Sequence, residues 1–174
     1  MRKVNRGVIL FLVVLVGMLF YMYAQIKHYE NLSTIIEPQT EEFADMVNST
    51  IRSLQEQQLT ESAALEFCAH AVQQYPYWYT ADQAQLDGQA EGLFSLYRSL
   101  LSSNAVLQAK YEIKDLSLIE QHQHYYTFRC SMLWHYENVD TSNIVCDFYF
   151  VQTKRGFRLL GTSMWERFVE KGRG

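Results

Sequence analysis

Asp147 and Tyr149 are the two residues of this sequence whose types and spacing best fit chemistry. Asp147 is the only acidic residue in the otherwise apolar segment 144–151, and Tyr149 follows two positions later. On a strand, both side chains would project from the same face. A buried carboxyl group with a raised pKa can move protons, so an acid–base pair is one interpretation. The alternative is a face that meets solvent or a partner, with Asp147 paired to Arg129 or Arg158 across a sheet.

Aromatic residues gather in one short segment and at two strand ends. The segment 75–79 reads YPYWY. Such side chains supply a large contact area at low entropy cost, which fits the rim of a pocket for an apolar ligand or an anchor for a partner. The alternative is that they fill the open end of the core. The candidate residues for an aromatic pocket or partner surface are Tyr75, Tyr77, Trp78, Tyr79, Trp134, Tyr149 and Trp165.

Histidines and cysteines give no sign of a metal site. His122 and His124 are two positions apart, as ligands on one face of a strand would be, but no third ligand is near and their polar neighbours are typical of a hairpin. The three cysteines, Cys68, Cys130 and Cys146, lack CxxC or CxxH spacing. Buried free thiols are expected, and a Cys130–Cys146 bridge is the alternative if two strands bring them together. We therefore predict no metal and no cofactor.

The charge distribution argues against nucleic acid as a partner. Four basic residues, Arg2, Lys3, Arg6 and Lys27, precede every acidic residue. Removing these four from 15 basic residues leaves 11 against 19 acidic ones, so residues 28–174 carry a formal net charge of −8. A domain this acidic repels phosphates.

Residues 7–24 form an uncharged, proline-free apolar stretch. As a helix they would be about 27 Å long, close to the thickness of a hydrocarbon core. A cleaved signal peptide would have a shorter apolar stretch with small residues at its cleavage site, which Met22 before Ala24 fits poorly. The basic residues ahead of the stretch predict a cytoplasmic N-terminus. We therefore predict a cytoplasmic tail at 1–6 and a single-pass plasma membrane anchor at 7–27, with the C-terminal part extracytoplasmic.

The remainder of the chain predicts one α+β domain at 38–168, between a juxtamembrane linker at 28–37 and a tail at 169–174. Apolar residues recur at steps of three and four in three segments, of which the first opens at Pro38. From residue 105 onward the period changes to two, so three helices are expected to pack on a curved four-stranded antiparallel sheet. A bulge near residues 114–115 would bring both halves of the first strand to the core.

This order of elements resembles the cone-shaped nuclear-transport-factor-2-like fold. With the anchor, the topology is similar to that of the inner-membrane scaffold subunit of type IV secretion and conjugation machines, which implies a noncatalytic protein that holds other envelope proteins together. Enzymes of this fold often use an acid and a tyrosine in their pocket, which is the role the resemblance implies for Asp147 and Tyr149. Many members place a short hairpin between the second and third helices, where this chain has only the segment 75–79.

The sequence therefore predicts a noncatalytic, membrane-anchored interaction or scaffold module of the cell envelope. Its expected partner, besides the lipid bilayer, is an envelope protein or a second copy of the chain. The apolar second face of segment 144–151 motivates this expectation, since an uncovered apolar patch needs a partner. One alternative is a domain that binds a small hydrophobic ligand inside an open cone, and the other is an acid–base enzyme.

Overall fold

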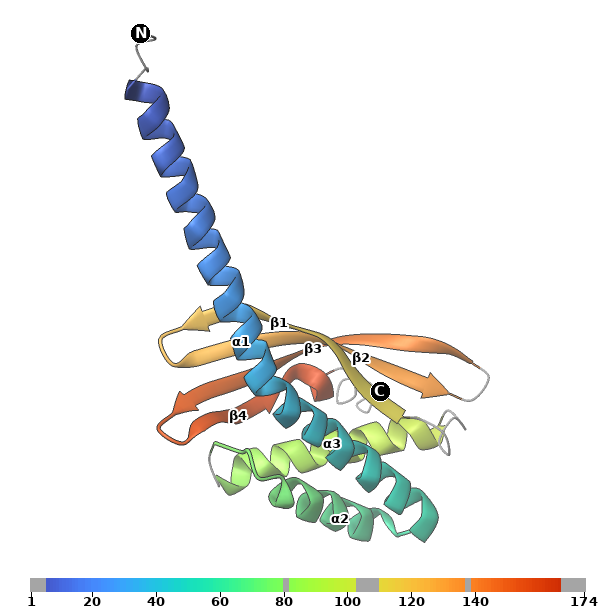
Figure 1. The fold of residues 1–174 in the computed structure, drawn as a ribbon. Coiled ribbons are helices and arrows are strands. Elements are labelled where there is room, and N and C mark those ends of the chain that lie inside the picture. The colour runs from blue at the N-terminus through green and yellow to red at the C-terminus, as the bar shows by residue number, and fades with distance from the viewer. Residues whose placement is uncertain (1–5, 80–81, 103–109, 137–138, 167–174) are drawn as a thin grey trace.

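In the described part of the chain, a four-stranded sheet packs with three α-helices and one short 3-10 helix. The structure is a computed structural model, which describes residues 6–79, 82–102, 110–136 and 139–166. Its elements are α1 (Arg6–Gln57), α2 (Glu61–Gln74), α3 (Gln83–Ser102), β1 (Lys110–His122), β2 (Tyr125–Tyr136), β3 (Val139–Thr153), β4 (Gly156–Thr162) and the short 3-10 helix η2 (Ser163–Trp165). The strands form one antiparallel sheet in the order β1-β2-β3-β4, and α1 crosses the curved sheet beside α2 and α3 (Figure 1). The predicted α+β class is confirmed.

The anchor and the first helix of the domain are one continuous helix, which corrects the sequence prediction. A linker at 28–37 and a separate helix opening at Pro38 were expected, but α1 runs through both. Leu32 and Ile36 are buried, so they extend the core-facing stripe of the helix back toward the anchor and hold this segment helical by packing. Pro38 is exposed, so its ring leaves that stripe uninterrupted. Among the residues that the structure describes there are therefore three α-helices, not an anchor and three more.

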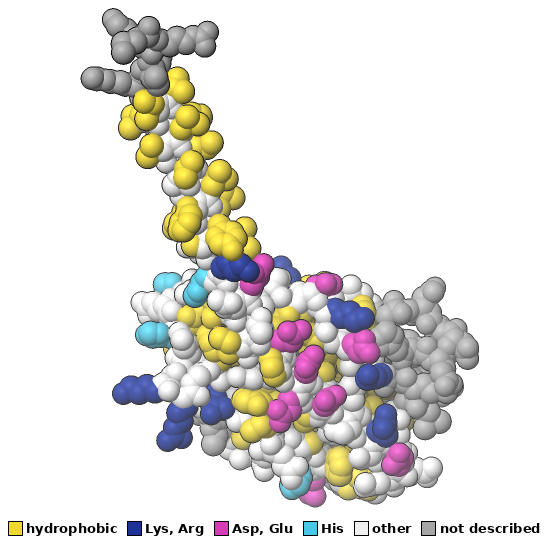
Figure 2. All heavy atoms as spheres, viewed as in Figure 1, with side chains coloured by type: hydrophobic (Ala, Val, Ile, Leu, Met, Phe, Trp, Pro, Cys, Tyr) yellow, Lys and Arg dark blue, Asp and Glu magenta, His cyan; other side chains and the backbone are white. Residues whose placement is uncertain are grey.

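The N-terminal part of α1 projects from the rest of the structure with its apolar side chains exposed. Figure 2 shows this stalk covered by hydrophobic side chains, and every large hydrophobic residue from Val8 to Tyr23 is exposed. This stretch is long and apolar enough to cross a membrane. A helical stretch that is apolar on all sides and projects away from the globular part fits a membrane anchor.

The core lies between one face of the sheet and the helices, and it is rich in aromatic rings. Phe128, Phe148 and Phe150 of the sheet are fully buried, and Phe43 of α1 packs on Phe148 with ring centroids 5.3 Å apart. Of the predicted helical stripes, the buried members are Phe43, Val47, Ile51 and Leu54 of α1, Cys68 and Val72 of α2, and Leu86, Leu93, Tyr97 and Leu100 of α3. Leu101, which was predicted on the stripe of the third helix, is exposed.

The predicted bulge in β1 is confirmed. The register with β2 shifts between Lys114 and Ser117, and Asp115 has a φ of 56°. On either side of the shift, Ile113 and Leu118 pack against the core although they differ in parity along the strand. The extra residue is what lets both halves of β1 face inward.

Candidate functional site

Three of the predicted aromatic site residues are part of the core. Tyr75, Trp78 and Trp165 surround Phe43, with ring centroids 5.6, 6.3 and 5.8 Å from it. Tyr75 and Trp165 are buried, and the indole Nε1 of Trp78 donates to the carbonyl of Val72 at 2.9 Å. These rings fill the interior, as the alternative interpretation of the aromatic cluster expects.

The other aromatic candidates are spread over different surfaces. Tyr77 is half-buried beside Arg158, whose guanidinium lies 5.9 Å from the centre of its ring. Tyr79 and Tyr149 are exposed, the latter on the sheet face that points away from the helices. The side chain of Trp134 lies outside the described residues. Within the described part of the chain, the structure does not gather the predicted set into one pocket.

The aromatic segment 75–79 also extends the sheet. The amide of Tyr79 donates to the carbonyl of Leu159 at 2.9 Å, and the amide of Leu159 donates to the carbonyl of Tyr77 at 2.7 Å. The segment therefore runs along β4 as a short parallel bridge. It covers an edge that would otherwise be open to another strand.

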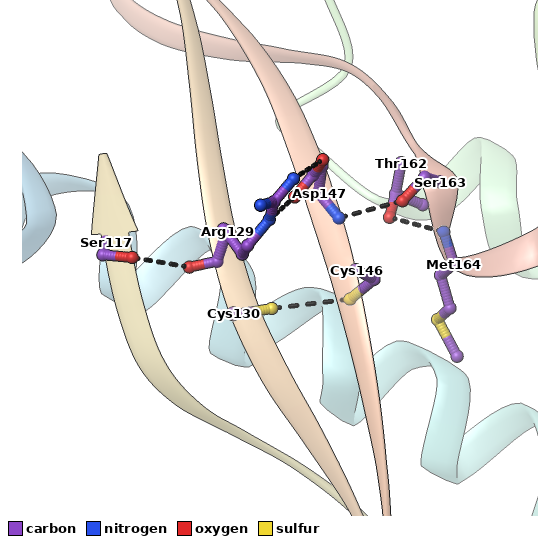
Figure 3. A network of polar contacts seen from close by, with 8 residues as sticks. All are labelled: Ser117, Arg129, Cys130, Cys146, Asp147, Thr162, Ser163 and Met164. Atoms are coloured by element: carbon purple, nitrogen blue, oxygen red, sulfur yellow. Dashed lines mark hydrogen bonds and ion pairs between the residues drawn. The ribbon is translucent and has the colours of Figure 1, made fainter. Parts of the chain in front are cut away.

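Asp147 lies on the outer face of the sheet, paired with Arg129. The carboxylate oxygens Oδ1 and Oδ2 accept from Arg129 Nε and Nη2 at 2.8 and 2.9 Å, and the backbone amide of Asp147 donates to Ser163 Oγ at 2.9 Å (Figure 3). Burial and the Asp147 carboxylate raise the pKa of the nearby Tyr149. The pairing of Asp147 with Arg129, which the sequence offers as the alternative to an acid–base pair, is the arrangement in the structure.

The two histidines of the predicted turn are exposed where β1 turns into β2. His122 ends β1, and His124 follows in the turn. Among the residues that the structure describes, no three histidine, cysteine, aspartate or glutamate side chains gather as metal ligands would.

A groove that the sequence interpretation missed lies between α1 and α2. The two helices meet at residues 58–60 and diverge from there (Figure 1), which leaves a groove of about 430 Å³ between them. This volume falls in the range of small-molecule sites. The lining comprises Glu42, Asp45, Met46, Ser49, Thr50 and Ser53 of α1 with Phe67, His70, Ala71, Gln74, Tyr75 and Pro76 of α2 and the turn after it.

The apolar part of the groove is held in place by Tyr75. Its hydroxyl donates to the carbonyl of Gln39 at 2.8 Å and so ties the end of α2 to α1. Burial, followed by the nearby carboxylate of Glu42, raises the pKa of Tyr75 far above the usual range, so the phenol stays neutral. Pro76 cannot continue α2, and the helix therefore ends at Gln74, just before Tyr75 and Pro76, which line the groove.

The rim of the groove is acidic. Glu42 and Asp45 are exposed on α1, and no lysine or arginine lines the groove. Figure 2 shows acidic side chains gathered where α1 crosses the globular part. The hydroxyls of Ser49 and Thr50 donate back to the carbonyl of Met46, so only their oxygen lone pairs are available to a ligand. A groove that combines apolar side chains with two carboxylates suits a ligand that is both apolar and positively charged.

One sequence signal points to this groove in retrospect. Phe67 is only half-buried and packs against the core beside the stripe of α2 that carries Cys68 and Val72. A large ring beside the buried stripe indicates a second contact surface on the helix.

Comparison with known proteins assigns no family to the chain. No family model matches it, and no curated protein matches it. Among solved structures, a phospholipid-binding protein from Ralstonia solanacearum, in complex with a phospholipid, is similar at 15% identity, with a TM-score of 0.39 over 77% of this chain and 83% of that one. Likeness at this level assigns neither a family nor a ligand, and the resemblance to cone-shaped scaffold subunits stays a prediction.

Proposed function

We propose that the protein is a membrane-anchored binding module whose groove between α1 and α2 takes a basic, amphipathic segment of another membrane or envelope protein. The groove itself is the observation that supports this. It combines the apolar side chains of Met46 and Phe67 with the acidic pair Glu42 and Asp45. An amphipathic partner helix would place its apolar side on the former and its lysine or arginine side chains against the latter.

The continuous helix α1 gives the groove a fixed place near the membrane. Glu42 lies 19 residues beyond Tyr23, the last large hydrophobic residue in the uninterrupted apolar stretch, and every residue between them is helical. At about 1.5 Å per residue this spans about 28 Å along the helix axis. A partner with its own anchor in the same bilayer would meet the groove at a raised effective concentration. A short basic segment then suffices for binding.

The reactive side chains favour a binding function over a catalytic one, because they are either buried or already paired. Cys68, Cys130 and Cys146 are buried in the core, where a thiol meets no substrate. Both carboxylate oxygens of Asp147 are engaged by Arg129. The expectation of a noncatalytic protein agrees with these placements and remains a proposal.

The interior of the cone and the outer face of β3 are weaker candidates for a binding site than the groove. A small hydrophobic ligand inside the cone would compete with Phe43, Phe148 and Trp165, which pack against one another there. The apolar second face of β3 does expose Val145 and Tyr149, but Asp147 lies between them in its ion pair with Arg129. The polar pair interrupts the patch that the sequence predicts for a partner.

The test is photo-crosslinking of the full chain in its native membrane. A photoreactive residue replaces either Ser49, which lines the groove, or Ser117, which is exposed on β1. We expect an adduct with a basic segment of a membrane or envelope protein from position 49 only. The double variant Glu42→Lys/Asp45→Lys should lose the adduct, whereas Glu41→Lys should keep it, because Glu41 is exposed on the same helix without lining the groove.

Two outcomes would count against the groove. One is an adduct that forms equally from positions 49 and 117. The other is an adduct at position 49 that survives the reversal of both rim charges while the chain stays folded.

A further inference from the structure

Cys130 and Cys146 face each other directly across β2 and β3. They are partners in the strand register, and their sulfur atoms are 3.5 Å apart (Figure 3). Both are almost fully buried on the core face of the sheet, at 1% and 2% exposure. The next pair in the register, Arg129 and Asp147, carries the ion pair on the opposite face. Two adjacent pairs in the register of β2 and β3 thus place two thiols on the core face of the sheet and an ion pair on its outer face.

The thiol pair lies where the sheet narrows. β4 pairs with β3 only between Phe148 and Thr153 of β3. Cys146 is therefore just beyond the last residue of β3 that has a partner on β4, while its pairing with β2 continues to Val139. From this point on, β2 and β3 form an arm that lacks the support of the fourth strand. A covalent link at this place would hold the two strands together at the base of the arm.

The geometry points to Cys130 and Cys146 as a dithiol–disulfide pair that oxidises when the domain folds in an oxidising compartment. Opposed residues of antiparallel strands have Cα atoms about 4.5–5.5 Å apart, which falls inside the range of about 4.4–6.8 Å that disulfides span. The sulfurs need to approach by about 1.5 Å to reach bonding distance, a movement that small side-chain rotations supply. Cys68 lies on α2 and keeps its thiol.

The oxidation is a thiol–disulfide exchange with an external disulfide. One cysteine thiolate attacks the external disulfide, forms a mixed disulfide and releases one external thiol. The second thiolate then attacks the cysteine sulfur of the mixed disulfide and releases the other external thiol. Two electrons pass to the external disulfide, and the two protons of the cysteines end on the released thiols. Because both sulfurs are buried in the folded sheet, the exchange takes place during folding or transient opening of the strands.

The test uses the full chain in detergent micelles, with glutathione as the probe. The chain is equilibrated at several ratios of oxidised to reduced glutathione, in urea below the unfolding transition so that the strands open. Free thiols are then trapped and counted under denaturing conditions. We expect three thiols at the reducing end and one, that of Cys68, at the oxidising end. Both partners fall in the tryptic peptide 130–154, which in the oxidised chain should carry no trapping group and have the mass of its sequence less two hydrogen atoms.

Matched variants identify the pair and its effect. Cys68→Ala should go from two thiols to none, whereas Cys130→Ala and Cys146→Ala should keep two free thiols at every ratio once glutathione adducts are excluded by mass. In the Cys68→Ala chain, oxidation should raise the melting temperature by roughly 5–10 °C, since the bridge closes a loop of about 15 residues in the unfolded state.

Three thiols at every glutathione ratio would overturn the inference. So would oxidation that leaves the mass of peptide 130–154 unchanged. The thiol count of the chain taken directly from cells is a separate readout. If the pair oxidises with glutathione but is reduced in cells, the pair stands and the domain does not fold in an oxidising compartment. Neither result depends on the groove, so the proposed binding function is tested independently.

Discussion

Asn48 and Tyr111 join the anchor helix to the edge of the sheet through two hydrogen bonds. The amide of Tyr111 donates to Asn48 Oδ1 at 2.8 Å, and Asn48 Nδ2 donates to the carbonyl of Tyr111 at 2.9 Å. The side-chain amide takes the place that the backbone of a further strand would take at the outer edge of β1. α1 is thus fixed to the sheet by a directional contact as well as by apolar packing.

We expect Asn48→Ala to lower the free energy of unfolding by about 1–3 kcal/mol, because it removes two hydrogen bonds that each contribute about 0.5–1.5 kcal/mol. Urea unfolding of the full chain in micelles, followed by tryptophan fluorescence, measures this change. Gln57→Ala, at an exposed position of the same helix, is the control and should stay within about 0.5 kcal/mol of the parent. Equal midpoints for the two variants would contradict the role given to Asn48.

Two glycines of α3 make a matched pair for a packing prediction. A Cβ atom added at Gly92 would lie 2.7 Å from Trp165 Cβ and 2.8 Å from Cδ1, whereas one added at Gly88 would meet nothing within 4 Å. The indole Nε1 of Trp165 donates to Gln89 Oε1 at 2.6 Å, so α3 and η2 are held closely together. Gly92 lets the base of the tryptophan side chain approach the helix backbone.

Gly92→Ala should therefore destabilise the fold by about 1–3 kcal/mol through overpacking. Gly88→Ala should stabilise it by about 0.5–1 kcal/mol, because alanine loses less backbone entropy in a helix. Thermal unfolding of the two variants measures the opposite shifts. A melting temperature that rises in both would show that Trp165 does not pack on α3 as described.

The spacing of apolar residues predicted most of the fold. The change of period near residue 105 correctly separated helices from strands, and the parity change between Ile113 and Leu118 correctly required a bulge. The prediction of a separate helix after the anchor was wrong, because a single proline was given more weight than the spacing of apolar residues. Pro38 suggested a helix start, although Leu32 and Ile36 continue the same stripe through it.

The groove, by contrast, depends on how two helices diverge in space. On α1 the groove is lined by Met46 and by polar neighbours of the buried stripe, and the spacing of apolar residues describes these positions only as a partly exposed side of the helix. The pairing of Cys130 with Cys146 could be predicted from the sequence only in part. Placing both on strands was within reach of the sequence, but their direct opposition depends on the turn and the register.

The buried thiol of Cys68 predicts a loss of stability at alkaline pH. Burial raises its pKa from the ordinary value of 9.0 to about 12. Between these values the unfolded chain has lost the proton and the folded chain keeps it, so the stabilisation is complete below pH 9 and falls as pH rises toward 12. The slope contributed by one such group is at most about 1.4 kcal/mol per pH unit.

We expect Cys68→Ala to flatten the fall in unfolding free energy between pH 9 and pH 10. The raised pKa values of Tyr75, Tyr97, Tyr149 and Cys130 add the same slope to both chains, so the difference between parent and variant reports Cys68 alone. Urea titrations at closely spaced pH values give the slope. An identical slope in the parent and the variant would show that the thiol is accessible to solvent in the folded state.

Pro38 predicts a weak point in the anchor helix. It cannot donate to the carbonyl of Thr34, so Pro38→Ala adds one helical hydrogen bond at an exposed position. We expect a gain of up to about 3 kcal/mol in local helix stability. Hydrogen exchange of the amides in residues 34–42 measures it, and Glu37→Ala, which leaves the proline in place, should change their protection little.

The continuity of α1 predicts that the groove is held at a fixed rotation about the anchor. Each alanine inserted after Lys27 turns everything beyond it by about 100° and moves it by about 1.5 Å. Two alanines therefore rotate the groove by about 200°, whereas four rotate it by only about 40° beyond a full turn, although they displace it twice as far. If a partner anchored in the same bilayer binds the groove, the crosslink from position 49 should weaken strongly with two alanines and persist with four. A yield that falls steadily with insertion length would mean that height above the membrane matters and rotation does not. Equal yields would mean that the segment after Lys27 is flexible and does not transmit the rotation.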